Sequence, residues 1–375
     1  MAVKLLKKGD VIRKVSESGS ILNEYRLTSD FSTFGGARSE SATAVDKDGR
    51  LYFVKKLTNY VFASDPKMMG NPATKKQHER AREYVNHQAE IYQKLEGFTL
   101  GGTLVVRDCA VIEGNFCYNI FPYVENQDVK VCELPMDERL RIVRLAAQGI
   151  QNLHRQDIVH ADLKPQNVLL EKGKSGHYTP KIIDFDDSFF EGNTPLPTDL
   201  VSTEEYYSPE LAIYYFSEGK KSFGVDATCI TRKTDIFTLG VIFCGFLTGG
   251  MPEQCEAGSP IYGPILNAIP KRGSLKNLKG KEILTIPEKD AKGDPIPAKV
   301  RDIVNKMLLP WYEERPTITE VCSSLSMAGT SVSPIKPKPI KRWKCKHCDT
   351  VNDLNKFVCC KCRKFKPLNP EYVIG

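Results

Sequence analysis

The sequence predicts an α+β protein with two lobes, a β-rich N-terminal lobe and a helical C-terminal lobe, followed by a small cysteine-rich module. Three observations support this prediction. Short apolar runs broken by turn signals fill residues 25–124, helical periodicity dominates after Asp128, and five of the 12 cysteines lie between Cys345 and Cys362. We expect the following segments: a lead-in (1–20), the two-lobed domain (21–323), a flexible linker (324–340), a finger (341–367) and a tail (368–375).

The composition is that of a globular protein with a sizeable core. Of the 375 residues, 41% are hydrophobic and 26% are charged. Residues 1–10 are polar and basic, unlike a signal peptide, and the most apolar run, 236–247, is far shorter than the ~20 residues of a membrane span. We therefore expect a soluble intracellular protein, cytoplasmic with a nuclear location as the alternative, and no membrane partner. The cysteines from Cys109 to Cys322 are scattered, as reduced core residues usually are.

In the N-terminal lobe we expect a mostly antiparallel sheet that is interrupted by one helix. Residues 51–57 (LYFVKKL) and 103–106 (TLVV) are short apolar runs typical of strands. Residues 75–95 have helical periodicity. Four side chains share one face of this predicted helix: Val85, Gln88, Tyr92 and Leu95.

In the C-terminal lobe we expect mainly helices. Residues 137–154 place apolar side chains at a spacing of three to four, which predicts an amphipathic helix. Residues 234–247 are apolar on nearly every face, which predicts a buried central helix. Residues 253–297 are polar and rich in Gly and Lys, and we interpret them as an insertion. The Ser-, Pro- and Lys-rich residues 324–339 are typical of a flexible to extended linker.

Two neighbouring segments contain the polar side chains on which the functional prediction depends. Residues 158–170 are IVHADLKPQNVLL, and residues 182–186 are IIDFD. These segments resemble the catalytic loop and the metal-binding loop of eukaryotic-type serine/threonine protein kinases, and the resemblance covers about residues 25–324. It implies the bilobal kinase fold, ATP and Mg²⁺ as cofactors, and transfer of the γ-phosphate of ATP to serine or threonine hydroxyls of protein substrates. Such transfer depends on positioning and charge neutralisation, which these residue types supply.

The resemblance implies a role for each polar side chain of the two loops. Asp162 takes the position of the catalytic aspartate that orients the acceptor hydroxyl and accepts its proton. Lys164 would lie beside the transferred phosphate, and a lysine here is typical of serine/threonine rather than tyrosine kinases. Asn167 and Asp184 match the ligands of Mg²⁺, a hard cation that prefers oxygen donors. Lys55 matches the lysine that holds the α- and β-phosphates of ATP.

The resemblance also predicts contacts outside these loops. Lys56 should face away from the ATP phosphates, because neighbouring residues of a strand point to opposite faces. Thr203 lies where the family places a threonine against the catalytic aspartate and lysine. Glu210 should form a buried ion pair with Arg315. Asp235 matches the aspartate that binds the backbone of the catalytic loop, and it could at the same time cap the helix that it opens.

The sequence departs from the family pattern at four places. The Gly-rich phosphate loop is reduced to Gly35 and Gly36 in TFGGARS, where backbone amides can still approach phosphate. Ala161 replaces the arginine that usually precedes the catalytic aspartate. Asp186 replaces the glycine of the metal-binding loop.

The fourth departure concerns the partner of Lys55. Counting back from Leu95 places Gln88 where the family has a glutamate, while choosing Glu90 would put Lys94 at an apolar position. Gln88, Glu90 and another carboxylate therefore stay open as partners. Because none of the four departures removes a residue that the transfer chemistry requires, an active kinase is favoured over the alternative, a pseudokinase scaffold whose finger binds RNA or a protein.

The C-terminal segment contains the pattern W-x-C-x₂-C-x₃-N-x₆-C-x₂-C. Its two Cys-x₂-Cys knuckles supply four thiolates for a tetrahedral, structural Zn²⁺ site, with these ligands: Cys345, Cys348, Cys359 and Cys362. The pattern resembles the Ran-binding-protein class of zinc finger, which implies binding of ubiquitin or of single-stranded RNA.

The segment around the finger is strongly basic. Between residues 336 and 366, nine Lys and two Arg face two Asp, while the whole chain carries a charge of +7. This excess is typical of a solvated linker, and it is equally compatible with attraction to RNA phosphates or to an acidic protein partner. Ubiquitin is less favoured, because Asp349 and Thr350 follow the second cysteine where the ubiquitin binders usually have Thr-Phe. We expect the finger to recruit a target to the kinase.

Overall fold

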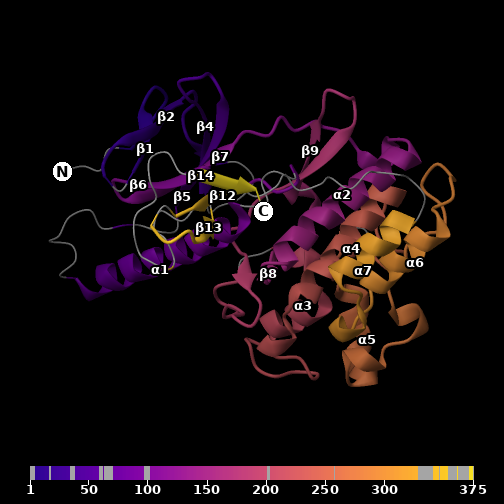
Figure 1. Cartoon of the computed structure of the whole chain (residues 1–375). Coiled ribbons are helices and arrows are strands. Elements are labelled where there is room, and N and C mark those ends of the chain that lie inside the picture. Colours follow the sequence, from indigo (N-terminus) through magenta and orange to yellow (C-terminus); the bar gives the residue numbers. More distant parts are fainter. Residues whose placement is uncertain are drawn as a thin grey trace.

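The computed structural model describes most of the chain. The described residues are 5–16, 18–33, 39–58, 62, 71–96, 102–200, 203–256, 258–327, 341–345, 347–353, 361 and 371–374. Among the predicted site residues, four lie outside these ranges: Gly35, Gly36, Cys359 and Cys362. The described part has the expected two lobes, with strands and one long helix in the first and helices in the second (Figure 1).

An antiparallel sheet forms most of the N-terminal lobe. Its strands follow the order β1 (Val11–Val15), β2 (Ile21–Leu27), β4 (Ser39–Val45), β5 (Leu51–Leu57), β7 (Phe116–Pro122) and β6 (Cys109–Glu113), and β3 (Ser32–Thr33) pairs with β4. The prediction of a strand at 51–57 is confirmed. Tyr25, Val54 and Ile120 are buried on one face of this sheet. Lys55 lies opposite Asn119 in the β5–β7 pair, which places it in the middle of the sheet.

Helix α1 (Pro72–Leu95) packs against the sheet (Figure 1). It begins earlier than predicted, because the Asn71 side chain accepts hydrogen bonds from the first turn and proline suits the first helical position. The buried residues of α1 include Gln88, Ile91, Tyr92 and Leu95, so most of the predicted face is confirmed, while Val85 is only partly buried. The face also presents Gln88 toward the second lobe.

The prediction of a sheet strand at residues 103–106 is wrong. Leu104 forms a parallel bridge with Ile182, and the Val105 amide donates to the Ile182 carbonyl at 3.0 Å. The segment is buried and apolar, as the sequence suggested, but it pairs with the strand that leads into the metal-binding loop. It thereby connects the first lobe to the second.

Helices build the C-terminal lobe: α2 (Met136–His154), α3 (Pro209–Phe216), α4 (Arg232–Thr248), α5 (Gly263–Arg272), α6 (Ala298–Met307) and α7 (Ile318–Met327). Helix α4 is central and nearly all of its residues are buried, as predicted, and α2 matches its predicted range. Gly240 lets α4 approach α6 closely, because a Cβ there would lie 3.0 Å from the Met307 Cβ. Residues 253–297 form more than a polar insertion, since Ile261, Ile265 and Ile269 are buried in the main core.

Short elements complete the described structure. The hairpin β9 (Val168–Lys172) and β10 (Tyr178–Ile182) and the pair β8 (Ile158–Val159) and β11 (Phe189–Phe190) flank the predicted loops. Single 3₁₀ turns are η3 (Val131–Glu133), η4 (Pro165–Asn167), η5 (Glu204–Tyr206), η6 (Ala227–Cys229), η7 (Leu275–Asn277), η8 (Gly280–Glu282) and η9 (Tyr312–Glu314). At the C-terminus, β12 (Lys341–Lys344) pairs with β13 (Val351–Asp353) and with β14 (Glu371–Ile374). No helix among the described residues is long and apolar enough to cross a membrane.

Candidate active site

The catalytic loop is held by a buried carboxylate. The Asp235 side chain is 1% exposed and accepts hydrogen bonds from the His160 amide at 2.9 Å and the Ala161 amide at 3.0 Å. His154 Nε2 lies 2.9 Å from the same carboxylate. The predicted contact between Asp235 and the loop backbone is thus confirmed, whereas the helix is capped by Thr231. Ala161 has a φ of 66°, so this anchor holds the loop in a conformation that L-residues rarely adopt.

Three donors fix the Asp162 carboxylate. Its Oδ1 accepts from the Thr203 amide at 2.7 Å, and its Oδ2 accepts from Lys164 Nζ at 2.8 Å and from Asn167 Nδ2 at 3.2 Å. Lys164 Nζ also donates to the Thr203 hydroxyl at 2.7 Å. The predicted contacts of Thr203 with Asp162 and Lys164 are confirmed. Two side chains and one backbone amide thus orient the carboxylate.

Asn167 connects the catalytic loop to the metal-binding loop. Its Nδ2 donates to the Asp162 carbonyl at 2.7 Å, and its carbonyl accepts from the Ile183 amide at 3.0 Å. Asp184, two residues after the end of β10, has a φ of 66°, in the left-handed region that L-residues rarely adopt. Because Nδ2 of Asn167 faces Asp162, its Oδ1 is the atom that this residue would offer to a cation.

Lys55 forms two ion pairs with the metal-binding loop. Its Nζ lies 2.8 Å from Asp184 Oδ1 and 2.7 Å from Asp186 Oδ2. Burial lowers the pKa of Lys55, but the charges of Asp186 and Asp184 outweigh burial and raise it above its ordinary value. Burial has the opposite effect on the two carboxyls and raises the pKa of each. The charge of Lys55 outweighs burial at Asp184, whose pKa is lowered, but not at Asp186, whose pKa stays raised. Lys56 points to the other face of β5 and pairs with Glu40 at 2.8 Å, as predicted.

Helix α1 contacts the backbone of the metal-binding loop. Gln88 Nε2 donates to the Asp186 carbonyl at 2.8 Å and to the Phe185 carbonyl at 3.3 Å. Neither Gln88 nor the exposed Glu90 forms a described ion pair with Lys55, so the open alternative of another carboxylate is confirmed: Lys55 pairs with Asp184 and with Asp186, the residue that replaces the loop glycine. Sequence reasoning did not identify it, although a carboxylate at the position of the loop glycine was the available signal.

A buried ion pair anchors residues 202–210, which resemble the end of the activation segment of the kinase family, the stretch that follows the metal-binding loop. Arg315 Nη1 and Nη2 each lie 2.7 Å from one oxygen of Glu210, and both side chains are fully buried. The Thr234 hydroxyl donates to Glu210 at 3.0 Å. This confirms the predicted pair and connects α3 to α4 and to the turn before α7.

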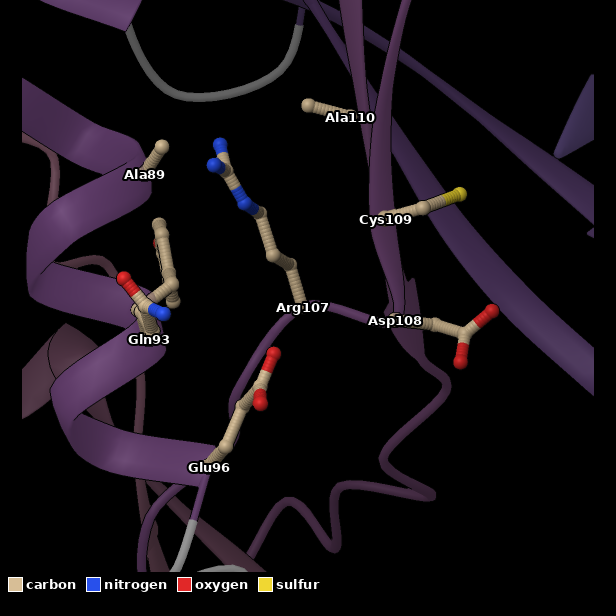
Figure 2. Close-up of a pocket in the computed structure, with 8 residues that line it drawn as sticks. Ala89, Gln93, Glu96, Arg107, Asp108, Cys109 and Ala110 are labelled. Carbon is tan, nitrogen blue, oxygen red and sulfur yellow. The ribbon is translucent and has the colours of Figure 1, made fainter. Parts of the chain in front are cut away.

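A separate pocket of about 480 Å³ lies between α1 and β6 (Figure 2). Arg107 extends between the two elements, with its guanidinium 4.6 Å from the centre of the Tyr92 ring and Nη1 at 2.8 Å from Asn119 Oδ1. None of the loop residues discussed above lines this pocket. It is therefore distinct from the cluster around Lys55.

Two backbone hydrogen bonds join Cys345 to Asp349 and Thr350, around the predicted first Cys-x₂-Cys knuckle. The Asp349 amide donates to the Cys345 carbonyl at 2.8 Å, and the Cys345 amide donates to the Thr350 carbonyl at 2.9 Å. Cys345 is buried, and Asp349 has a φ of 55°. Within the described residues no three Cys, His, Asp or Glu side chains gather as they would around a metal, and the second knuckle lies outside those residues.

The protein kinase domain family model matches residues 72–325, which is more than half of the chain. The chain belongs to the protein kinase family. A protein kinase domain implies the use of ATP and Mg²⁺. The matched residues include both loops of the site, whereas the strand that contains Lys55 precedes them.

Three relatives illustrate the range of kinases that the chain resembles. It is 30% identical over 180 residues to the ovarian-specific serine/threonine-protein kinase Lok of Drosophila melanogaster, covering 47% of this chain and 31% of that protein. It is 30% identical over 205 residues to MAP kinase-interacting serine/threonine-protein kinase 2 of Xenopus laevis (53% and 42%). It is 27% identical over 220 residues to calcium-dependent protein kinase 5 of Oryza sativa subsp. japonica (58% and 34%). The chain spans about a third of the length of the first of these kinases.

The donor set of the kinase site fits a magnesium nucleotide. Asp184 and Asn167 can each offer a side-chain oxygen, and Lys55 Nζ lies 2.8 Å from Asp184 Oδ1. Hard divalent cations prefer such oxygen ligands, and a buried lysine suits phosphate oxygens. When bound, Mg²⁺ would neutralise charge on the phosphates of ATP, beside the ammonium of Lys55.

Proposed function

We propose that the chain is an ATP-dependent protein kinase that transfers the γ-phosphate of ATP to serine and threonine hydroxyls of proteins. The observation that supports this most strongly is the cluster of Asp162, Lys164 and Thr203, in which two neighbours fix one carboxylate. A fixed carboxylate beside a lysine suits the acceptance of a hydroxyl proton next to a transferred phosphate.

In this proposal each residue has a defined task. Asp162 orients the acceptor hydroxyl and takes its proton, while Lys164 neutralises charge on the transferred phosphate. Asn167 and Asp184 hold Mg²⁺, and Lys55 holds the α- and β-phosphates. The backbone at Gly35 and Gly36 is proposed to cover the phosphates.

The alternative is a pseudokinase scaffold. A scaffold does not require the proton-accepting residue to be oriented, yet Asp162 accepts three hydrogen bonds from side chains and backbone of the site. Asp184 is also held at the edge of the site beside Lys55. These contacts favour the active enzyme.

Phosphate transfer from radiolabelled ATP to a panel of peptides and proteins tests the proposal. Asp162→Asn is expected to lower kcat by roughly 10²–10⁴-fold while ATP affinity stays within about twofold. The matched control is Asp137→Asn, an exposed aspartate in the first turn of α2, which should transfer at the parental rate. Label should appear on phosphoserine and phosphothreonine. Equal transfer by the Asp162→Asn variant, or label mainly on tyrosine, would show the assignment to be wrong.

We further propose that the C-terminal segment is a zinc finger that recruits the target. The turn around Cys345 and Cys348 supports the proposal, because paired cysteines in such a turn point their thiolates at one metal. The basic charge of the segment favours RNA or an acidic protein surface as the recruited ligand. A core this small needs metal for its stability.

Metal analysis tests the zinc site. The full chain should contain one equivalent of zinc, and replacing Cys345 and Cys348 by serine should remove it. The matched control is Cys360→Ser, which lies between two predicted ligands and should leave the zinc in place. Removing residues 336–375 should leave phosphorylation of a short peptide nearly unchanged and weaken action on the native target. A full chain without zinc would refute the site, and loss of peptide phosphorylation on truncation would refute its independence.

A further inference from the structure

The partner of Lys55 lies on the metal-binding loop and not on helix α1. We propose that Asp186 is a positioning residue whose carboxylate holds Lys55 for the ATP phosphates, a task that the resembled kinase family gives to a glutamate of this helix. The inference rests on the proposed kinase function, since it assigns a role within the same site.

The helix offers no charge to Lys55 at the expected position. Gln88 is 1% exposed and neutral, and its amide nitrogen is directed at the carbonyls of Phe185 and Asp186. Tyr84 adds a further hydrogen bond to the Asp186 carbonyl at 3.3 Å. These neutral hydrogen bonds bind the helix to the loop backbone, and they leave the lysine charge to be balanced elsewhere.

The loop supplies that charge. Lys55 Nζ lies 2.7 Å from Asp186 Oδ2, and the side chains of Lys55 and Asp186 are only 16% and 14% exposed. A buried ammonium at this depth needs a carboxylate with good geometry. Asp184 also contacts Lys55, but it is the residue proposed to bind Mg²⁺. Asp186 is therefore the carboxylate that can keep Lys55 in place while Asp184 serves the metal.

This arrangement changes what the position of α1 controls. When the lysine partner is on the helix, moving the helix breaks the ion pair. Here Lys55, Asp184 and Asp186 form one cluster, and α1 contributes hydrogen bonds from Gln88 to the backbone of that cluster. Lys55 should thus stay paired when the contact from Gln88 is removed.

The reactivity of Lys55 in the full chain, without nucleotide or metal, tests this inference directly. Amine labelling is followed by peptide mass spectrometry, with Lys56 in the same peptide as the internal reference, because its partner is Glu40. Asp186→Asn removes one of the two carboxylates that hold the Lys55 ammonium in the cluster, so the released amine should be labelled about tenfold faster at a fixed pH. Asp186→Glu should restore slow labelling.

Two α1 variants are the matched controls. Gln88→Met removes the hydrogen bonds to the loop backbone. Glu90→Gln removes the exposed carboxylate two residues beyond Gln88, the other α1 candidate for the partner of Lys55. Both should label Lys55 within about twofold of the parent, and melting curves establish that each variant is folded. The inference is overturned if Asp186→Asn labels like the parent, or if Gln88→Met accelerates Lys55 labelling as much as Asp186→Asn does.

Nucleotide binding gives the second readout. The dissociation constant for ATP should rise about tenfold in Asp186→Asn and recover in Asp186→Glu, because a displaced lysine holds phosphate less well. An unchanged dissociation constant in Asp186→Asn would also count against the role. A parent chain that transfers no phosphate would refute the proposed function, whereas the labelling result would still decide the position of Lys55.

Discussion

Removing the guanidinium of Arg315 should destabilise the kinase domain strongly. The guanidinium is enclosed by two oxygens of Glu210 at 2.7 Å and donates to the carbonyls of Leu309 at 2.7 Å and Pro310 at 2.8 Å. It also lies 4.9 Å from the centre of the Phe237 ring. Arg315→Met keeps much of the side-chain volume but leaves the Glu210 carboxylate buried without its counter-charge.

The expected magnitude follows from this burial. Breaking a fully buried pair by removing one partner costs about 3–5 kcal/mol, mostly because the remaining charge is desolvated and unpaired. For a domain of this size such a loss lowers the melting temperature by roughly 10 °C. The double variant Glu210→Met/Arg315→Met should recover part of the stability lost in Arg315→Met, because neither charge of the pair is left buried. Recovery should be incomplete, because the carbonyls of Leu309 and Pro310 still lack the hydrogen bonds that Arg315 donated.

Thermal unfolding followed by circular dichroism measures these effects. The matched control is Arg301→Met, which breaks an ion pair with Glu288 at 2.8 Å whose glutamate is 79% exposed. Exposed pairs contribute about 0–1 kcal/mol, so this variant should melt close to the parent. If Arg315→Met melted as close to the parent as Arg301→Met does, the reasoning about the buried pair would be wrong.

Thr203→Ala removes the hydroxyl that accepts from Lys164 and should lower kcat about tenfold in steady-state assays, whereas Thr203→Ser should stay near the parent. Burial raises the pKa of Glu191, but the hydrogen bonds and charge of Arg232 outweigh it and hold the pKa below 4.5. The stability that this pair contributes is thus complete above pH 4.5 and is lost as the pH falls below it. On acidification the melting temperature of Glu191→Gln should therefore fall less than that of the parent, and equal slopes of melting temperature against pH in the two proteins would contradict this. Ala161 supplies no guanidinium to bind a phosphorylated activation segment, so basal kinase activity should survive the alanine replacement of Thr194, Thr198 and Ser202 together. Loss of basal activity in this triple variant, with recovery when acidic residues replace the three hydroxyls, would contradict the prediction.

Local sequence pattern was sufficient to predict the strands and helices whose structure depends mainly on their own residues. The strand Leu51–Leu57 alternates around a buried Val54, and α2 places its apolar side chains at helical spacing. The contacts of Thr203 and Asp235 with the catalytic loop also follow from motif order, because the family's motif order fixes which residues meet.

Long-range geometry explains what the sequence did not predict. The partner of Lys55 depends on how closely the metal-binding loop approaches β5, which no local pattern encodes. Residues 103–106 have strand character, but their pairing with Ile182 is a tertiary contact that the local pattern does not encode. In residues 253–297 the numerous Gly and Lys masked the buried isoleucines at a spacing of four: Ile261, Ile265 and Ile269.

The most direct test of the central claim is single-turnover phosphate transfer by the parent and by Asp184→Ala, with ATP binding measured on the same samples across a Mg²⁺ titration. The parent should show Mg²⁺-dependent transfer to serine or threonine, and the variant should be slower by at least about 10²-fold, because the proposed Mg²⁺ ligand is lost. Transfer by Asp184→Ala at the parental rate, or no transfer by a parent chain that binds Mg²⁺ and ATP, would contradict it.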